Sequence, residues 1–179
     1  FGGDAELQRL RRDFLHNQAV ALMESGELDD AQTLLASLSR WGALDPSDLR
    51  GLLRGLAVSR LNAGDLDAAE ALVATGPLAA VFDPAARREI LAAIVLHRAD
   101  RIARKPEYAA AAAAVADGIS RLGAEPSLLE AFEMYTHNAA AELFNSRRFP
   151  EAKKLLEAAL ARYPASRMIR QDLDGVVAA

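Results

Sequence analysis

The chain of 179 residues contains no cysteine, which excludes both a disulfide framework and a thiolate metal site. No apolar run approaches the roughly 20 residues that span a bilayer. The sequence also has no glycine-rich phosphate loop, no nucleophile elbow and no HExxH-type helix. Because the usual catalytic signatures are missing, we expect a protein that is not an enzyme and that uses no metal or other cofactor.

Basic residues are too few to form a nucleic-acid footprint. The 21 Lys and Arg residues face 25 Asp and Glu residues, for a net charge of −4 and an isoelectric point of about 5.4. This balance argues against binding to nucleic acids and to anionic membranes. We expect a soluble protein, cytoplasmic or periplasmic. The start at Phe1 and the preference for Arg over Lys suggest one module of a larger bacterial protein.

Alanine, in contrast, makes up roughly a fifth of the chain, and it carries a pattern that occurs four times. The anchor alanines of the four copies are 38, 42 and 41 residues apart: Ala31, Ala69, Ala111 and Ala152. Another alanine lies twelve residues before each anchor: Ala19, Ala57, Ala99 and Ala140. A large apolar residue lies three before each: Leu28, Leu66, Tyr108 and Phe149. Such a period is typical of stacked helical hairpins.

Prolines and periodicity divide the chain into nine predicted helices. Proline suits the first helical turn, and Asp45 and Asp83 stand before Pro46 and Pro84 as acceptors for the free N–H groups of that turn. The predicted helices span 5–25, 28–40, 46–63, 66–75, 84–104, 107–122, 126–147, 150–162 and 166–178. The last of them has one apolar stripe, as expected of a helix that covers the exposed end of an array.

The pattern resembles the tetratricopeptide repeat family. The last copy carries the resemblance most clearly, through Asn138, Ala140, Leu143, Phe149, Ala152, Leu156, Ala159 and Pro164. The third copy is the most divergent, with Pro106 in its turn, and the intervals exceed the 34 residues usual in the family. The resemblance implies an all-α fold, a right-handed α-solenoid of four hairpins in a single domain over residues 1–179. Its repeats would span about 12–44, 50–82, 92–124 and 133–165, with a C-terminal capping helix at 166–178.

The resemblance further implies that the first helix of each hairpin lines a concave groove that holds a peptide or a partner protein. On this basis we expect a non-catalytic scaffold. The candidate partner-binding residues are His16, Asn17, Val20, Arg54, Val58, His97, Asp100, His137, Asn138 and Asn145. Their polar groups would bond the backbone of an extended ligand. An alternative is that these side chains are solvated or bonded locally on a helix face.

Other functions find less support in the sequence. His97 and His137 belong to different helices and lack the further ligands of a zinc site. Arg101, Arg104 and Lys105 share a helix face and either bind an acidic segment or complement the helix dipole. The second hypothesis for the whole chain is self-assembly, in which terminal repeats stack, and residues 1–10 either cover the first hairpin or pair with another copy. Under this hypothesis the chain would form a homo-oligomer.

Overall fold

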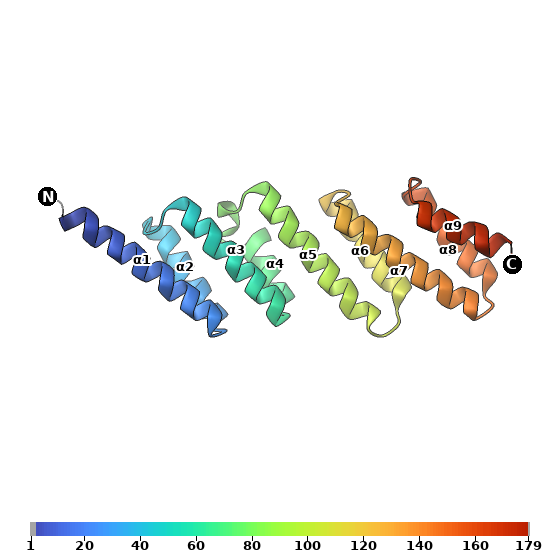
Figure 1. Ribbon diagram of the computed structural model, residues 1–179, viewed down its shortest axis with the longest axis horizontal. Coiled ribbons are helices and arrows are strands. Elements are labelled where there is room, and N and C mark those ends of the chain that lie inside the picture. Colours follow the sequence, from blue (N-terminus) through green and yellow to red (C-terminus); the bar gives the residue numbers. More distant parts are fainter. Residues whose placement is uncertain (1–2, 179) are drawn as a thin grey trace. The chain divides into compact units, whose positions relative to one another are not determined.

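The computed structural model describes residues 3–178, and all regular secondary structure in this range is helical (Figure 1). The elements are α1 (Gly3–Glu24), α2 (Leu28–Trp41), α3 (Pro46–Ala63), α4 (Leu66–Ala74), η1 (Ala79–Val81), α5 (Pro84–Ala103), α6 (Tyr108–Leu122), α7 (Pro126–Asn145), α8 (Phe149–Arg162) and α9 (Arg167–Val177). Each predicted helix boundary lies within two residues of the observed one. The predicted all-α fold is thereby confirmed for the described residues, and only the short 3-10 helix η1 was not expected.

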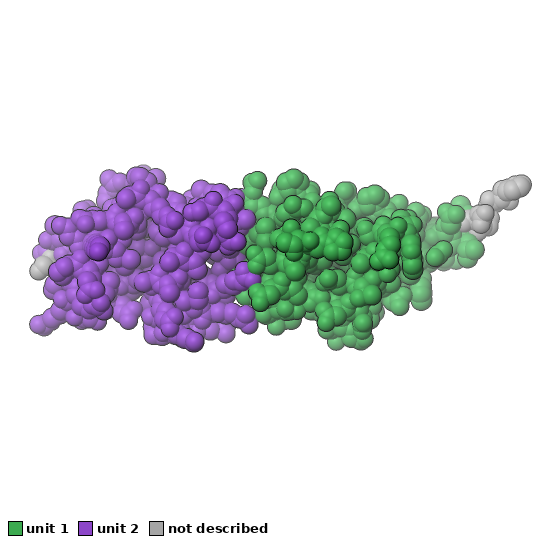
Figure 2. All heavy atoms as spheres, turned by 180° about the vertical axis from the view of Figure 1, so that it is seen from behind, with its two compact units in different colours: residues 1–94 green, residues 95–179 purple. Residues whose placement is uncertain are grey.

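The chain forms two compact units, residues 1–94 and residues 95–179 (Figure 2). The boundary falls within α5, which contributes its first half to unit 1 and its second half to unit 2. The expectation of a single domain over the whole chain stays a prediction.

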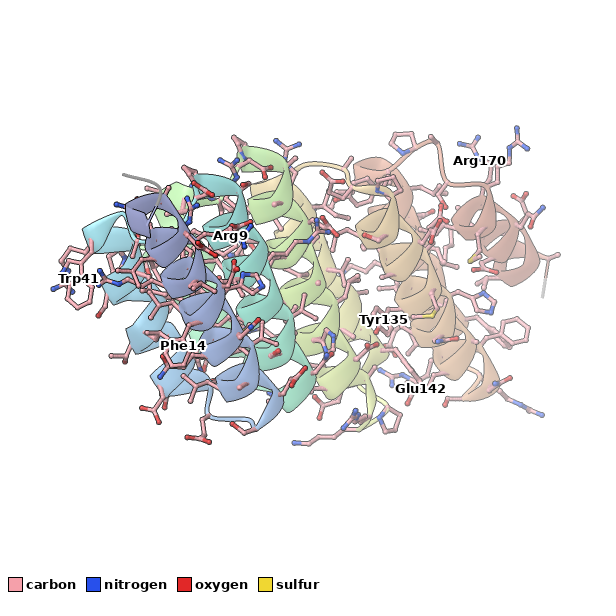
Figure 3. All side chains as sticks on the ribbon, turned by 60° about the vertical axis from the view of Figure 1, so that its left-hand side comes forward. Arg9, Phe14, Trp41, Tyr135, Glu142 and Arg170 are labelled. Atoms are coloured by element: carbon pink, nitrogen blue, oxygen red, sulfur yellow. The ribbon has the colours of Figure 1, made fainter. Side chains whose placement is uncertain are left out.

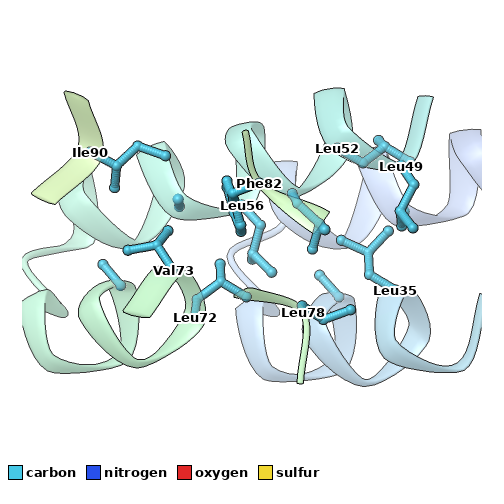
Figure 4. Close-up of a cluster of buried hydrophobic side chains, with 14 of the residues drawn as sticks. Leu35, Leu49, Leu52, Leu56, Leu72, Val73, Leu78, Phe82 and Ile90 are labelled. Carbon is cyan, nitrogen blue, oxygen red and sulfur yellow. The ribbon is translucent and has the colours of Figure 1, made fainter. Parts of the chain in front are cut away.

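In unit 1, α1 and α3 lie side by side, and each also packs on a shorter helix of its own hairpin, α2 or α4. Buried aliphatic side chains from these helices and from the start of α5 form one continuous core (Figure 4). Leu35 of α2 meets Leu49 and Leu52 of α3 there, while Val73 of α4 lies near Ile90 of α5. The core therefore runs between the hairpins as well as within them.

In unit 2, α7 is the central helix and packs on α6, α8 and α9. Phe132 of α7 meets Tyr163 edge to face, with ring centroids 4.8 Å apart. Gly118 of α6 lies so close to α5 that an added Cβ would come within 2.6 Å of a methyl group of Val95. Only a glycine permits this separation, so the side of α6 facing α5 is packed to its limit.

The anchor alanines occupy one repeated environment. All four have no exposed surface, and the alanines twelve residues earlier are buried as well. In each copy the anchor N–H donates to the carbonyl of the residue just before its helix, over 3.0 Å: Ala31 to Glu27, Ala69 to Asp65, Ala111 to Glu107 and Ala152 to Arg148. The sequence pattern thus corresponds to one local geometry in all four hairpins.

The turn between the two helices of each hairpin is repeated as well. In every copy the residue five positions before the anchor alanine has a positive φ. These residues are Gly26 (81°), Gly64 (77°), Pro106 (24°) and Arg147 (58°). In the first, second and fourth turns the following N–H bonds a carbonyl five residues back, as Glu27 does with Leu22. In the same three turns the N–H of the positive-φ residue also bonds a carbonyl three residues back, as Gly26 does with Met23. Pro106 has no N–H for this second bond and is held outside its preferred φ, so the third turn departs from the others, as its sequence suggested.

The two aspartates predicted to cap helices behave differently. Asp83 does cap α5, because the Ala86 N–H donates to its carboxylate over 2.8 Å, and this bond holds the pKa of Asp83 below its usual value. The prediction for Asp45 was wrong, since its side chain caps no N–H of α3. Its carboxylate instead accepts from Arg12 of α1 over 3.4 Å, so it joins two helices.

Arg60 is a buried cation at the end of α3, at a position where the other copies have Leu22, Ile102 and Leu143. One guanidinium nitrogen donates to Asp29 (2.7 Å), Gln32 (3.0 Å) and the carbonyl of Leu28 (3.3 Å), all at the start of α2. A second donates to Asp65 in the next turn (2.8 Å), while Nε has no partner. Arg60 therefore ties the first hairpin of unit 1 to the second.

Replacing Gly26 by alanine should lower the free energy of unfolding by about 1–2 kcal/mol, the usual cost of a side chain in the left-handed region. A Cβ at Gly26 would meet nothing within 4 Å, so the loss would come from the backbone alone. The reverse change, Arg147→Gly, should add about 0.5 kcal/mol. Urea unfolding measures both, and equal stability of the Gly26→Ala variant and the parent would contradict the turn geometry.

Truncation of Arg60 should be more costly than its replacement by an apolar side chain of similar volume. We expect Arg60→Ala to lose about 2–3 kcal/mol through the cavity it leaves, and Arg60→Leu to lose less than about 1 kcal/mol. The two carboxylates can return to water, because Asp29 and Asp65 are well exposed. If both variants lose the same stability in urea, the ion pairs and not the volume hold the hairpins together.

Candidate partner-binding surface

The ten predicted partner-binding residues all lie on the first helices of their hairpins: α1, α3, α5 and α7. None is buried. His16, Val20 and Asn138 are half-buried, and the other seven are exposed. A partner can therefore reach each of them, which is the minimum that a binding surface requires.

Three of the predicted residues already have a partner on the next first helix, 35 residues along the chain. Arg54 of α3 donates to both carboxylate oxygens of Glu89 in α5, at 2.8 and 2.9 Å. His137 of α7 lies 2.9 Å from Asp172 of α9 through its Nδ1 atom. Arg54 and His137 are both fifteen residues before an anchor alanine, so the same position makes the same kind of link in both units.

The third such residue is Asp100, which binds α5 to α7. The hydroxyl of the buried Tyr135 donates to its carboxylate. Burial, followed by this hydrogen bond, raises the pKa of Tyr135 far above its usual value of 10. The phenol therefore remains a proton donor, and Asp100 has a structural role that the sequence pattern did not indicate.

A pocket of about 270 Å³ lies between α7 and α9, and we call it the α7–α9 pocket. Two predicted residues, His137 and Asn145, line it. Its apolar wall includes Phe144 and Val176, and the rest of its lining is Ala140, Ala141, Gln171, Asp172 and Gly175. A Cβ at Gly175 would meet nothing within 4 Å, so this glycine leaves the pocket open on the α9 side.

Sequence reasoning missed the α9 side of this pocket because α9 was interpreted only as a cap. The 35-residue spacing from His137 to Asp172 was the available signal, since Arg54 and Glu89 have the same spacing. A second hollow of unit 2, of about 380 Å³, has Asn138 of α7 and Tyr108 of α6 in its lining. Ala141 and Asn145 line both hollows, so the two hollows adjoin at these residues of α7.

Unit 1 has a different kind of pocket, between α1 and the start of α3. Its volume is about 460 Å³, and its lining is almost wholly charged or polar: Arg9, Arg12, Asp13, His16, Asn17, Asp45 and Asp48. Of the predicted residues in unit 1, His16 and Asn17 line it, and Val20, Arg54 and Val58 do not. His97 and Asp100 of unit 2 line neither the α7–α9 pocket nor the hollow next to Tyr108.

Among residues 3–178, no three histidine or acidic side chains lie together in a way that would hold a metal ion. Within the same residues, no helix is both long enough and apolar enough to span a membrane.

Comparison with protein-family models, curated proteins and solved structures finds no match to this chain. The resemblance to tetratricopeptide repeats stays an expectation that rests on the repeated positions described above.

Removing the hydroxyl of Tyr135 should weaken the link between α5 and α7. We expect Tyr135→Phe to lower the free energy of unfolding by about 1–2 kcal/mol, the value of a buried hydrogen bond to a charged group. Tyr163→Phe is the matched control, because it keeps the ring contact with Phe132, and it should be nearly neutral. Equal stability losses in the two variants would contradict a specific role for the Tyr135 hydroxyl.

The same bond predicts a pH dependence. Because the pKa of Tyr135 is raised in the folded state, the unfolded chain releases this proton first as the pH rises. The stabilisation is complete below about pH 10 and declines above it in the parent but not in Tyr135→Phe. Urea unfolding between pH 8 and 11 measures the difference.

Proposed function

We propose that this chain is a non-catalytic scaffold that binds an extended peptide or a peptide-like segment of a partner protein. We further propose that its hairpins form an α-solenoid of the tetratricopeptide repeat type, with α9 as the final helix. The repeated anchors and turns support this fold. The observation that carries the function is the α7–α9 pocket, which combines an accessible aromatic wall with hydrogen-bonding groups on a first helix.

The size of the pocket favours a peptide over a free small molecule. Ligand pockets for drug-sized molecules have volumes of about 300–1,000 Å³. At about 270 Å³ the α7–α9 pocket accommodates one large side chain, with the rest of the ligand outside it. Phe144 and Val176 would contact an aliphatic or aromatic side chain of the peptide. The amides of Asn145 and Gln171 can each donate to and accept from the adjacent peptide backbone.

The pairing of His137 with Asp172 limits what these two residues can contribute. The Nδ1 atom of His137 faces the carboxylate, which leaves Nε2 as the group available to a ligand. The Asp172 side chain is largely covered, so it orients the imidazole more than it offers a separate binding group. The proposed recognition therefore depends mainly on Phe144, Asn145 and Gln171.

Filling the pocket should abolish binding without damage to the fold. Gly175→Leu introduces a side chain into the open side of the α7–α9 pocket, and its higher helix propensity should preserve or raise stability by up to about 1 kcal/mol. The probe is a phage-displayed library of twelve-residue peptides selected on the parent protein. We expect the selected peptides to carry a shared aliphatic or aromatic residue and to bind Gly175→Leu at least tenfold more weakly by fluorescence anisotropy.

Ala161→Leu is the matched control, because it adds the same side chain at an exposed position of α8. It should bind the selected peptides as the parent does. Phe144→Ala removes the aromatic wall and leaves the pocket open, so it tests the contact with the wall apart from the space available. It should weaken binding as well. Equal affinity of the parent and Gly175→Leu for every selected peptide would exclude this pocket as the binding site.

A further inference from the structure

The α7–α9 pocket has a neighbour in unit 2, which we call the turn hollow because it reaches the turn between α5 and α6. Its volume is about 380 Å³, and its lining consists of Pro106, Tyr108, Asn138, Ala141, Glu142, Asn145 and Ser146. Ala141 and Asn145 line the α7–α9 pocket as well, so these residues of α7 form the boundary between the two spaces. A ligand that fills both spaces must cross α7 at this boundary.

The turn hollow differs from the α7–α9 pocket in its charge. Glu142 is the only residue of its lining with an ionised side chain, and it is exposed near the C-terminal end of α7 (Figure 3). The remaining polar groups of the lining are neutral: a phenol, two amides and a hydroxyl. Tyr108 adds an aromatic ring, whose face attracts cations. The turn hollow is therefore complementary to a positively charged group.

The polar groups of the turn hollow are available to a ligand. In the part of the chain that the structure describes, the side chains of Asn138, Glu142 and Asn145 form no hydrogen bond or ion pair. The guanidinium of Arg148 donates instead to both carboxylate oxygens of Glu151, at 2.7 and 2.5 Å. That bond, and to a smaller extent the charge of Glu142, raise the pKa of Arg148. The Glu142 carboxylate thus keeps its acceptor positions.

The boundary between the two spaces suits an extended backbone. Ala141 has a small side chain, so a peptide can cross α7 there, and the amide of Asn145 beside it can donate to and accept from that peptide. In an extended peptide, residues two positions apart present their side chains on the same face, about 6.5–7 Å from each other. One such side chain would enter the α7–α9 pocket and the other the turn hollow.

We propose that unit 2 binds a peptide with an aliphatic or aromatic residue and, two positions from it, a lysine or an arginine. The apolar side chain occupies the α7–α9 pocket, and the cationic group pairs with Glu142 in the turn hollow. This inference rests on the proposed function, because it needs a peptide whose apolar residue fills the α7–α9 pocket. It adds the second position of the bound sequence and its charge.

The probe is the set of peptides selected on the parent protein, resynthesised with an acetylated N-terminus so that side chains alone carry positive charge. Both positions two residues from the shared apolar residue are varied among lysine, glutamine and glutamate. At one of them we expect lysine to bind about three- to fivefold more tightly than glutamine, the strength of an exposed ion pair, and glutamate to bind most weakly. Fluorescence anisotropy measures these differences, which should shrink at high salt.

Charge reversal in the protein tests the residue assigned to the cation. Glu142→Lys should invert the preference, so that the glutamate peptide binds more tightly than the lysine peptide. Glu130→Lys is the matched control, because Glu130 is an exposed residue of α7 that lines neither space, and its replacement changes the net charge equally. The control should retain the preference for lysine, and both variants should retain the melting temperature of the parent.

The outcomes separate this inference from the proposed function. If Gly175→Leu abolishes binding while Glu142→Lys leaves the preference for lysine unchanged, this inference alone is overturned, because the peptide then uses the α7–α9 pocket without the turn hollow. A preference of the parent for glutamate would also overturn it, since the exposed Lys105 and Arg147 beside the hollow would then select the ligand. Equal binding by the parent and Gly175→Leu would remove the proposed function, and the two-position sequence with it.

Discussion

Two helices can approach one another only as closely as the side chains between them allow. In each of the four hairpins a fully buried alanine sits where the second helix begins, and a second buried alanine lies on the first helix twelve residues earlier. Larger side chains at these points would separate the helix axes and expose the aliphatic core beside them. The remaining features of both units, including the positions of their exposed side chains, depend on this close contact.

Polar links add specificity to this apolar framework. Arg12, Arg54, Asp100 and His137 each contact a side chain 33 or 35 residues along the chain, on the next first helix or, for Asp45, just before it. The exposed ion pairs of Arg12, Arg54 and His137 contribute little free energy, whereas the bond from the buried Tyr135 to Asp100 contributes more. Each link fixes which side chains of neighbouring helices lie opposite one another. Arg60 makes the comparable link on the side of the second helices, where it replaces an apolar residue with a buried cation.

These links change how the surface of the first helices should be interpreted. A side chain that already bonds its neighbour must give up that bond before it binds a ligand, so Arg54 and Asp100 are poorer candidates than their exposure suggests. Asn145 and Phe144 have no such commitment to a neighbouring first helix, and they line the α7–α9 pocket. Under the proposed function, peptide binding by unit 2 would therefore depend mainly on the junction of α7 with α9.

The sequence alone determined the helices, their boundaries to within two residues and the register of the anchor alanines, because helix signals are local and the pattern occurs four times. It also placed all ten candidate residues on first helices. It could not show that Asp45 accepts a hydrogen bond from Arg12, that Asp100 accepts one from Tyr135, or that α9 lines a pocket together with His137. Those outcomes were decided by the tertiary structure. Each depends on which side chains meet across two packed helices, and the residues that meet are 33 to 35 positions apart in the chain.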